Sequence, residues 1–497
     1  MIFRANHQQL LSGSEKYLNM NPVNVIAVDL DGTLTLTDTL YESMLSLVRK
    51  RPILLFVLPF WLLKGRAFFK FKVAEISELD VSSLPYNLQL IDWLKNEKVS
   101  GKEIVLSTGA NELIAQAVSE HLSLFDDVIA SDVNTNLISE KKLAALKDRF
   151  GHKGFAYAGN SRDDIKIWAC SCLAIIVNAK SVVQVQATQV VSASKIFPPA
   201  KLKCLDWIKA LRIYQWLKNL LLFVPLLAAH QFGNMQSLNS LLLAFLAFSL
   251  CASSVYITND LFDLQSDRRH PRKKLRPFAS GKLSIAKGLT MILPLIGLSF
   301  VLGQMIGEEF LSFLILYFLL TIAYTLKLMQ VVLLDCFTLA TLYTLRIIAG
   351  AAAVSVPLSF WLTAFSVFIF LSLAFVKRYA ELIVQAQAGN NISHGRGYEV
   401  SDTLLLQTLG VSSGYISVLI IALYMRSEDV ITLYAHPAAI WLALPLLLFW
   451  ISWVWFNAVK GFMHDDPIIF AIKDKASMLV AVFMSMVFIY ASNGFGY

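Results

Sequence analysis

The sequence predicts two fold classes within one chain of 497 residues: an N-terminal α/β domain with a helical cap, and a C-terminal all-α domain with about nine membrane-spanning helices. The first observation is composition. The chain is 56% hydrophobic and only 16% charged, with a mean hydropathy of +0.59, which is too apolar for an ordinary soluble protein. The second observation is distribution. Residues 1 to about 205 have soluble composition apart from a run at 53–63, whereas apolar stretches of about 20 residues, the length of a membrane-spanning helix, recur from about residue 211.

The two patterns give provisional domain boundaries. We expect an N-terminal extension over residues 1–22, an α/β domain over 23–200 with its cap at about 35–100, and a membrane domain over 201–497. The first 22 residues are too polar to supply the apolar segment of a cleavable signal peptide. The five cysteines have no spacing typical of a zinc site or a disulfide framework.

Short apolar runs separated by helical stretches predict a parallel sheet covered on both faces. The expected strands are Asn24–Leu30, Glu103–Thr108, Val128–Ser131, Gly154–Gly159 and Ala174–Ala179. Ligands collect at the carboxyl ends of the strands in such sheets, and that is where the polar residues of this region lie.

A pair of carboxylates follows the first strand. Asp29 and Asp31 point the same way because they are two residues apart, and Gly32 lets the backbone turn away. One carboxylate can attack a phosphorus atom while the other handles the proton on the leaving oxygen. Thr108 ends the second strand, and Lys142 begins a helix from which it can neutralise a phosphorylated intermediate.

The fourth strand leads into AGNSRDDIKIW, where Asn160, Asp163 and Asp164 are available to a metal. Ser107 and Lys141 stay open as alternatives to their neighbours at the second and third motifs. A single pair of aspartates is often only a solvated loop, but four such features at consecutive strand ends favour an active site.

These motifs, DLDGT, the threonine, the lysine and GNSRDD, resemble the four motifs of the haloacid dehalogenase superfamily of phosphohydrolases over about residues 22–200. The resemblance implies a Rossmann-like fold. The roles that it implies are nucleophile for Asp29, acid/base for Asp31, phosphate binding for Thr108 and Lys142, and Mg²⁺ binding for Asp29, Asp31 through its carbonyl, and Asn160 or Asp164. Many relatives have Asp in place of Asn160, so a degenerate regulatory domain is the alternative.

The expected cap contains the apolar run PILLFVLPFWLLKGRAFFKFK, residues 52–72. It is too short to span a bilayer and is interrupted by Pro59. Its basic flank is typical of a segment at a membrane interface, in which case the phosphatase acts on something attached to a lipid. A helix buried inside the cap is the alternative.

The distribution of basic residues predicts the membrane topology. The expected spans are about 214–230, 238–260, 284–304, 309–327, 331–353, 358–377, 404–425, 436–457 and 475–493. The loop after the second span carries Arg268, Arg269, Arg272, Lys273, Lys274, Arg276 and Lys282, whereas AHQFGNMQSLN and VSVP in alternate loops have no Lys or Arg. Because positive loops stay in the cytoplasm, the loop after the second span and the N-terminal domain are expected to face it, together with the candidate sites that they carry. Topology thus explains the net charge of +8 without a nucleic-acid partner.

A second acidic motif ends the second span. On a helix, Asn259, Asp263 and Asp267 fall on one face, and Asp260 points elsewhere. Three oxygen-bearing side chains at the end of a membrane helix are costly unless a cation binds there, and oxygen ligands suit Mg²⁺ carrying phosphate oxygens. Cationic contacts for a diphosphate are expected from His270, Arg272, Lys273, Lys274 and Arg276.

The NDxxDxxxD motif followed by RPxxSG resembles the first aspartate-rich motif of the UbiA superfamily of intramembrane prenyltransferases, over about residues 205–497. Members usually carry a second acidic motif after the sixth span, but FVKRYAELIVQAQAGNNISHGRGYEV stands there instead. The expected substrate-binding residues of the membrane domain, besides the loop cations, are Lys218, Asn219, Tyr343, Arg346, Lys377, Arg378 and Arg396.

This combination resembles the branch that makes decaprenylphosphoryl-phosphoribose from polyprenyl phosphate and phosphoribosyl pyrophosphate (PRPP). Cations in place of carboxylates would hold an anionic lipid phosphate. The resemblance implies an Mg²⁺-dependent bifunctional enzyme of the bacterial inner membrane, a possible homo-oligomer, that transfers 5-phosphoribose and then removes the 5-phosphate during cell-envelope biosynthesis. Two alternatives stay open: a prenyltransferase that joins an allylic diphosphate to an aromatic acceptor, and a membrane-anchored phosphatase whose helices only dock or carry lipid.

Overall fold

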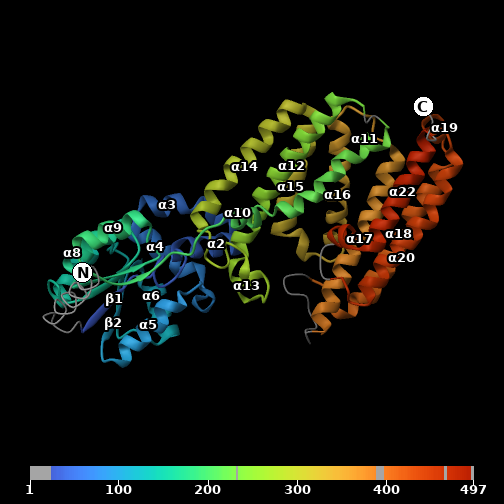
Figure 1. Ribbon diagram of the computed structural model, residues 1–497. Helices are drawn as coiled ribbons and strands as arrows, with labels where there is room; N and C mark the ends of the chain where they lie inside the picture. Colours follow the sequence, from blue (N-terminus) through green and yellow to red (C-terminus); the bar gives the residue numbers. More distant parts are fainter. Residues whose placement is uncertain (1–23, 231–232, 388–396, 464–466, 494–497) are drawn as a thin grey trace, which may run out of the picture. The chain divides into compact units, whose positions relative to one another are not determined.

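The computed structural model describes residues 24–230, 233–387, 397–463 and 467–493, and the chain forms two compact units (Figure 1). Unit 1 comprises Met1–Ala210 and Ile257–Thr290, and unit 2 comprises Leu211–Tyr256 and Met291–Tyr497. The expected N-terminal extension lies outside the described residues.

Unit 1 is built on a six-stranded parallel sheet in the order β3-β2-β1-β4-β5-β6. Its strands are β1 (Val25–Val28), β2 (Glu103–Asn111), β3 (Asp127–Ser131), β4 (Ala156–Gly159), β5 (Leu173–Val177) and β6 (Ala193–Phe197). The predicted parallel sheet is confirmed. The sequence analysis missed β6, whose ASKIF sequence lacks the unbroken apolar run of a central strand because β6 lies at the edge.

Helices cover both faces of this sheet. Ile26 and Val28 of β1 belong to a core with α5 and α6, whereas Val25 and Ala27 belong to a core with α7, α8 and α9. This alternation follows from the two-residue period of a strand. The helices are α5 (Leu88–Val99), α6 (Glu112–Leu122), α7 (Glu140–Phe150), α8 (Ile165–Cys170) and α9 (Ser181–Val190).

A helical cap lies between β1 and β2 in the sequence. It consists of α2 (Thr39–Lys50), η1 (Pro52–Phe56), α3 (Leu58–Leu63) and α4 (Arg66–Ser77). Asp38 starts α2 by accepting hydrogen bonds from the backbone N–H groups of Leu40 and Tyr41. The cap has its own small core around Leu47 and Val73.

The segment Ile257–Thr290 belongs to unit 1 and is held to the cap by a buried ion pair. It contains α13 (Leu264–Arg269) and η5 (Lys273–Leu275). Arg268 donates two hydrogen bonds to Glu42 of α2, at 3.1 and 2.5 Å, and the two side chains are 7% and 2% exposed. A third bond, from Arg268 to the Ala279 carbonyl, ties the segment to itself. Residues far apart in the sequence therefore form one folded unit.

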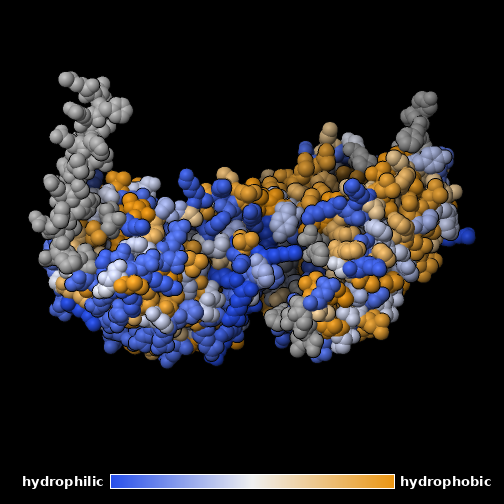
Figure 2. Space-filling view, turned by 60° about the horizontal axis from the view of Figure 1, so that its bottom comes forward, coloured by the Kyte–Doolittle hydropathy of each residue, from blue (hydrophilic) through white to orange (hydrophobic). Residues whose placement is uncertain are grey.

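Unit 2 is helical, and among the described residues eight helices are long and apolar enough to cross a membrane. They are α12 (Met235–Phe262), α14 (Ile285–Ile306), α15 (Glu308–Leu326), α16 (Leu334–Ala353), α17 (Phe360–Gln387), α18 (Thr403–Tyr424), α20 (Ala443–Val459) and α22 (Lys475–Asn493). The short helix η8 (Pro437–Leu442) directly precedes α20. Two of the eight, α12 and α14, extend into unit 1. Figure 2 shows hydrophobic residues over much of the surface of this unit and hydrophilic residues over most of unit 1.

The first of the nine expected spans differs from the rest. It forms the 3₁₀ helix η4 (Ile213–Phe223) followed by α11 (Val224–Ala228), a shorter apolar segment than the other eight. Gly350 of α16 permits its close approach, because a Cβ atom at Gly350 would lie 2.1 Å from the Leu222 carbonyl oxygen. α16 is itself well enclosed, with 72% of its most apolar stretch buried. This packing places η4 against the interior of unit 2.

Candidate active sites

The first candidate site lies at the carboxyl ends of the central strands of unit 1. Asp29 follows β1, and the Lys142 ammonium donates a hydrogen bond to its carboxylate at 2.7 Å. Lys142 also donates to the Tyr157 hydroxyl at 3.1 Å, and that hydroxyl donates to Asp164 at 2.9 Å. Four buried side chains therefore form one hydrogen-bonded chain that joins three of the sequence motifs.

The sequence analysis missed Tyr157. It lies within AYAG of β4, where it reads as one more apolar residue of a buried strand. The available signal is chemical: a fully buried tyrosine hydroxyl needs a hydrogen-bond partner, and polar residues follow this strand. Burial and the nearby carboxylates of Asp164 and Asp29 raise the pKa of Tyr157 well above its usual value.

The site has an excess of buried negative charge. Burial raises the pKa of Asp29 to about 6, although Lys142 partly offsets this effect. Burial, together with Asp38, raises the pKa of Asp31 to about 7. Burial alone would lower the pKa of Lys142, but the carboxylates of Asp29 and Asp164 outweigh it and raise that pKa. The two raised pKa values show that both carboxylates are costly to ionise at this position. A divalent cation bound here would stabilise their charged forms.

The fourth motif is positioned by hydrogen bonds to Asp164. One of its oxygens accepts from the backbone N–H groups of Asn160 and Ser161 and from the Ser161 hydroxyl, and the other accepts from Tyr157. A carboxylate has about four acceptor positions, so a metal at Asp164 would replace one of these donors. The Asn160 side chain lies against Gly32, where a Cβ atom would be 2.0 Å from its nitrogen. Its amide thus lies beside the turn that carries the two N-terminal aspartates.

The structure also shows the residues next to Lys142, Asp164 and Thr108, two of which the sequence left open as alternative site residues. Lys141 is exposed, so Lys142 is the lysine that reaches the site. Asp163 is exposed as well. The Thr108 hydroxyl accepts from the Ala110 N–H, whereas the Ser107 hydroxyl is buried without a hydrogen-bond partner among the described residues. Both hydroxyl groups therefore remain candidates for phosphate binding.

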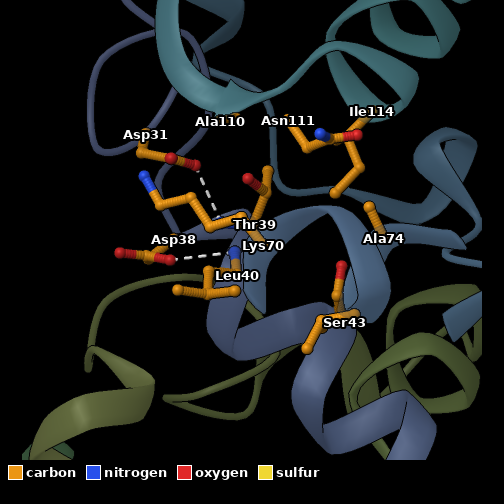
Figure 3. Close-up of a pocket in the computed structure, with 11 residues that line it drawn as sticks. Asp31, Asp38, Thr39, Leu40, Ser43, Lys70, Ala74, Ala110, Asn111 and Ile114 are labelled. Carbon is orange, nitrogen blue, oxygen red and sulfur yellow. Dashed lines mark hydrogen bonds between the residues drawn. The ribbon is translucent and has the colours of Figure 1, made fainter. Parts of the chain in front are cut away.

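A cavity of about 60 Å³ lies between the cap and the first site (Figure 3). Asp31 lines it and accepts a hydrogen bond from the Thr39 backbone N–H at 2.8 Å, and Asp38 lines it beside Leu40. The hydroxyl groups of Thr39 and Ser43 are buried without partners among the described residues. The cavity therefore offers polar groups from the cap next to the predicted acid/base.

The second candidate site is the aspartate-rich end of α12, in the part of this helix that belongs to unit 1. Arg276 donates to both Asp260 and Asp267, at 3.0 and 2.6 Å, and each carboxylate is 2% exposed. The Asn259 side-chain oxygen is buried and has no hydrogen-bond partner in the described part of the chain. The same segment thus holds a buried side-chain oxygen without a partner and two buried carboxylates that share one arginine, a donor set that fits a cation-binding role. Burial raises the pKa of Asp267 although Arg276 acts to lower it.

The expectation that Asp260 points away from this site is wrong. α12 ends at Phe262, and Asp263 adopts a non-helical conformation before α13 begins. Helical periodicity therefore cannot be extended from Asn259 to Asp267. Asp263 instead pairs with Arg49 of the cap at 3.0 Å, and both side chains are partly exposed. Among the described residues, no group of three or more His, Cys, Asp or Glu side chains is already arranged around a metal position.

The basic loop residues have different roles. The Nδ1 atom of His270 accepts from the backbone N–H groups of Arg272 and Lys273, so it caps a turn. Burial and nearby cations lower the pKa of His270. Lys274 is exposed, and Arg276 is the cation that contacts the carboxylates.

Unit 2 contains a separate buried polar cluster on η4 and α16. Arg346, 4% exposed, donates to the Asn219 side chain at 2.9 Å and to the Tyr317 hydroxyl at 2.9 Å. The Lys218 ammonium lies 5.6 Å from the centre of the Tyr343 ring. The four residues expected here, Lys218, Asn219, Tyr343 and Arg346, are therefore brought together within this unit, and Tyr317 is an addition.

The cations after the sixth span are less available than the sequence indicates. Arg378 is buried and pairs with Asp335 and Glu381, and it donates to the Tyr324 hydroxyl at 2.8 Å. Lys377 is partly buried, and Arg396 lies outside the described residues. Two carboxylates thus compensate the charge of Arg378 within the unit.

Comparison with known proteins identifies relatives of both parts of the chain. The UbiA prenyltransferase family model matches residues 220–467. "Uncharacterized protein y4nM" of Sinorhizobium fredii is 33% identical over 466 residues, covering 93% of this chain and 90% of that protein. "Nodulation protein NoeC" of Azorhizobium caulinodans is 38% identical over 285 residues, covering 56% of this chain and 91% of that protein.

Two further matches concern enzymes and solved structures. Decaprenyl-phosphate phosphoribosyltransferase of Mycobacterium tuberculosis is 29% identical over 290 residues, covering 57% of this chain and 93% of that protein. A solved UbiA homologue from Archaeoglobus fulgidus, bound to GPP and Mg²⁺, is 15% identical with a TM-score of 0.43, covering 57% of this chain and 99% of that chain.

Proposed function

The chain belongs to the UbiA prenyltransferase family, and we propose that it transfers 5-phosphoribose from PRPP to polyprenyl phosphate and then removes the 5-phosphate. The observation that carries this proposal is the presence of two acidic centres in one chain, one at Asp260 and Asp267 and one at Asp29 and Asp31. The similarity to decaprenyl-phosphate phosphoribosyltransferase supports the choice of donor and acceptor.

The transfer step joins the lipid to the sugar. An oxygen of the lipid phosphate attacks the anomeric carbon of PRPP, the bond from that carbon to the pyrophosphate oxygen breaks, and pyrophosphate leaves. Asn259, Asp260 and Asp267 would hold Mg²⁺, which neutralises the pyrophosphate when it is bound. Arg276, now shared between the two aspartates, can move to the phosphate groups when a metal takes its place.

The second step removes the 5-phosphate, and we assign it to a haloacid dehalogenase-like site in unit 1. Asp29 attacks the phosphorus while Asp31 protonates the leaving sugar oxygen, and water then hydrolyses the aspartyl phosphate. Lys142 holds the attacking carboxylate in place, and Tyr157 and Asp164 hold Lys142. The raised pKa of Asp31, about 7, suits a proton donor.

The test uses the purified full chain in vesicles that contain polyprenyl phosphate, with radiolabelled PRPP and Mg²⁺. The wild type should give a labelled lipid without the 5-phosphate. Asp267→Asn should give no labelled lipid, and Asp29→Asn should give a labelled lipid that is heavier by one phosphate in mass spectrometry. Glu309→Gln and Asp148→Asn, at exposed carboxylates outside both sites, are the matched controls.

The outcomes separate the proposal from its alternative. Prenylation of an aromatic acceptor from an allylic diphosphate, without incorporation from PRPP, would replace the proposed transfer. Complete dephosphorylation of the lipid by pure Asp29→Asn protein would refute the assignment of the second step.

A further inference from the structure

The cap carries an exposed apolar tip, residues 52–66, which we call the cap tip. It comprises η1, α3 and the residues that connect them to each other and to α4. Its largest outward side chains are Ile53, Phe56, Phe60 and Leu63, which are 78%, 76%, 66% and 85% exposed. Large apolar side chains gathered in this way mark an interaction surface.

The inner side of the cap tip is packed. Leu58 is buried in the small core of the cap with Phe69 and Val73, and Leu54 and Trp61 pack against it. Figure 1 shows α3 beside α4. The segment is therefore not a helix buried inside the cap. Its inner side chains are packed, but its outer apolar side chains are exposed.

The sequence of the cap tip and its flanks is basic, although Arg49, Lys50 and Lys72 pair with Asp263, Glu78 and Glu75. From Ser43 to Ala74 the sequence contains no Asp or Glu. The same stretch contains seven basic residues, namely Arg49, Lys50, Arg51, Lys64, Arg66, Lys70 and Lys72. Of these, Arg51, Lys64 and Arg66 border the apolar side chains directly and are exposed. An apolar surface with a basic border is complementary to the interface of a bilayer with anionic headgroups.

We propose that the cap tip inserts into the surface of an anionic lipid bilayer. The apolar side chains enter the region below the headgroups, and the basic residues bind lipid phosphates. The protein is expected to be embedded in a bilayer, since the described part of the same chain contains eight helices that are long and apolar enough to span one. The cap tip is too short to span it and therefore lies in one leaflet.

Anchoring of the cap tip would also help the proposed phosphatase step, and this part of the inference rests on the proposed function. α2 and α4 lead from the cap tip to the cavity, which they line with Thr39, Ser43 and Lys70. Thr39 and Lys50 are separated by about 16 Å along α2, at 1.5 Å per residue. A lipid-linked sugar phosphate can thus place its head near Asp31 while its tail stays in the bilayer, so the substrate class is a membrane-bound phosphate ester.

The experiment places the photoreactive residue p-benzoylphenylalanine at position 60 of the full chain in lipid nanodiscs. Irradiation should give protein carrying the mass of one phospholipid. Leu88 and Val99, which are 69% and 89% exposed on α5 of the same unit, are matched control positions and should give little lipid adduct. Equal adduct yields at the three positions, or a cross-link from position 60 to protein, would overturn the proposal.

The basic border is tested in the same assay. Arg51→Gln and Lys64→Gln should each lower the adduct yield about fivefold in discs rich in phosphatidylglycerol, the factor for one basic side chain near an anionic surface. Phosphatidylcholine discs should show no such change. An unchanged yield in both would refute the role of anionic lipid. Adduct formation needs no turnover, so this result is independent of the proposed phosphatase activity.

Discussion

Asp31 and Asp38 line the same cavity, and the charge of one influences the protonation of the other. Burial, followed by Asp38, raises the pKa of Asp31 to about 7. The acid form of Asp31 therefore persists up to about neutral pH, which is the form that can protonate a leaving oxygen. Asp38 also holds the start of α2 through two backbone N–H groups. One residue thus combines a structural role with an electrostatic one.

Asp38→Asn separates these roles, because asparagine is an equally good helix cap but carries no charge. The dephosphorylation rate of the wild type should fall as the pH rises through about 7, the pKa of Asp31. In Asp38→Asn the pKa of Asp31 should be lower, so the rate should begin to fall at lower pH. The measurement is kcat against pH for a soluble phosphate ester, with Asp148→Asn, at an exposed carboxylate of α7, as the control. An unchanged profile would show that Asp38 does not influence the proton donor.

Strand ends made several site residues predictable. Asp29 and Lys142 were expected because polar residues at the ends of parallel strands converge, and the structure joins them. The proximity of Asp260 to Asp267 was not expected, since the direction of the Asp267 side chain depends on where α12 stops, and the sequence has no proline or glycine at that point. Tyr157 could not be singled out, because a tyrosine in a buried strand usually contributes only to packing.

At the scale of elements, the segment Ile257–Thr290 is fixed to the cap by the pair of Arg268 with Glu42. Breaking a buried ion pair by removing one charge leaves the other uncompensated, which typically costs about 3–5 kcal/mol. The neighbouring contact of Arg49 with Asp263 is partly exposed and contributes less. The buried pair is therefore the main polar anchor of this segment.

Glu42→Gln should release the segment without unfolding the sheet. We expect faster trypsin cleavage within residues 264–283, followed by mass spectrometry, and a loss of phosphoribosyl transfer. Glu78→Gln is the matched control, because Glu78 forms an exposed pair with Lys50 of the same helix. The exchange of both charges, Glu42→Arg with Arg268→Glu, should restore part of the protection. Equal cleavage of the wild type and Glu42→Gln would contradict this anchoring role.

Element types were more predictable than their details. Five strands and eight long apolar helices follow from runs of apolar residues, and the structure contains them. The irregular form of η4 was not foreseen, because hydropathy reports burial and not the hydrogen-bond pattern of the backbone. Its close packing depends on Gly350, a residue more than 100 positions away in the sequence.

At the scale of the whole molecule, the proposed function requires a lipid intermediate that passes from the site at Asp267 to the site at Asp29. A mixture of Asp29→Asn and Asp267→Asn proteins should therefore make the dephosphorylated lipid when both are in the same vesicle, since the intermediate diffuses between them within the membrane. In separate vesicles the same mixture should stop at the phosphorylated lipid, because the intermediate does not leave its bilayer. Mass spectrometry of extracted lipid distinguishes the products. Full product from separate vesicles would mean that the intermediate is water-soluble.

α12 begins in one unit and ends in the other, and this has a consequence for the gene. A reading frame cut after residue 210 would encode an N-terminal product with Glu42 and Arg49 but without their partners. The second product would keep Arg268 and Asp263 with nothing to bind them. A membrane domain encoded alone would need other partners for the segment Ile257–Thr290, so these ion pairs favour keeping both units in one chain.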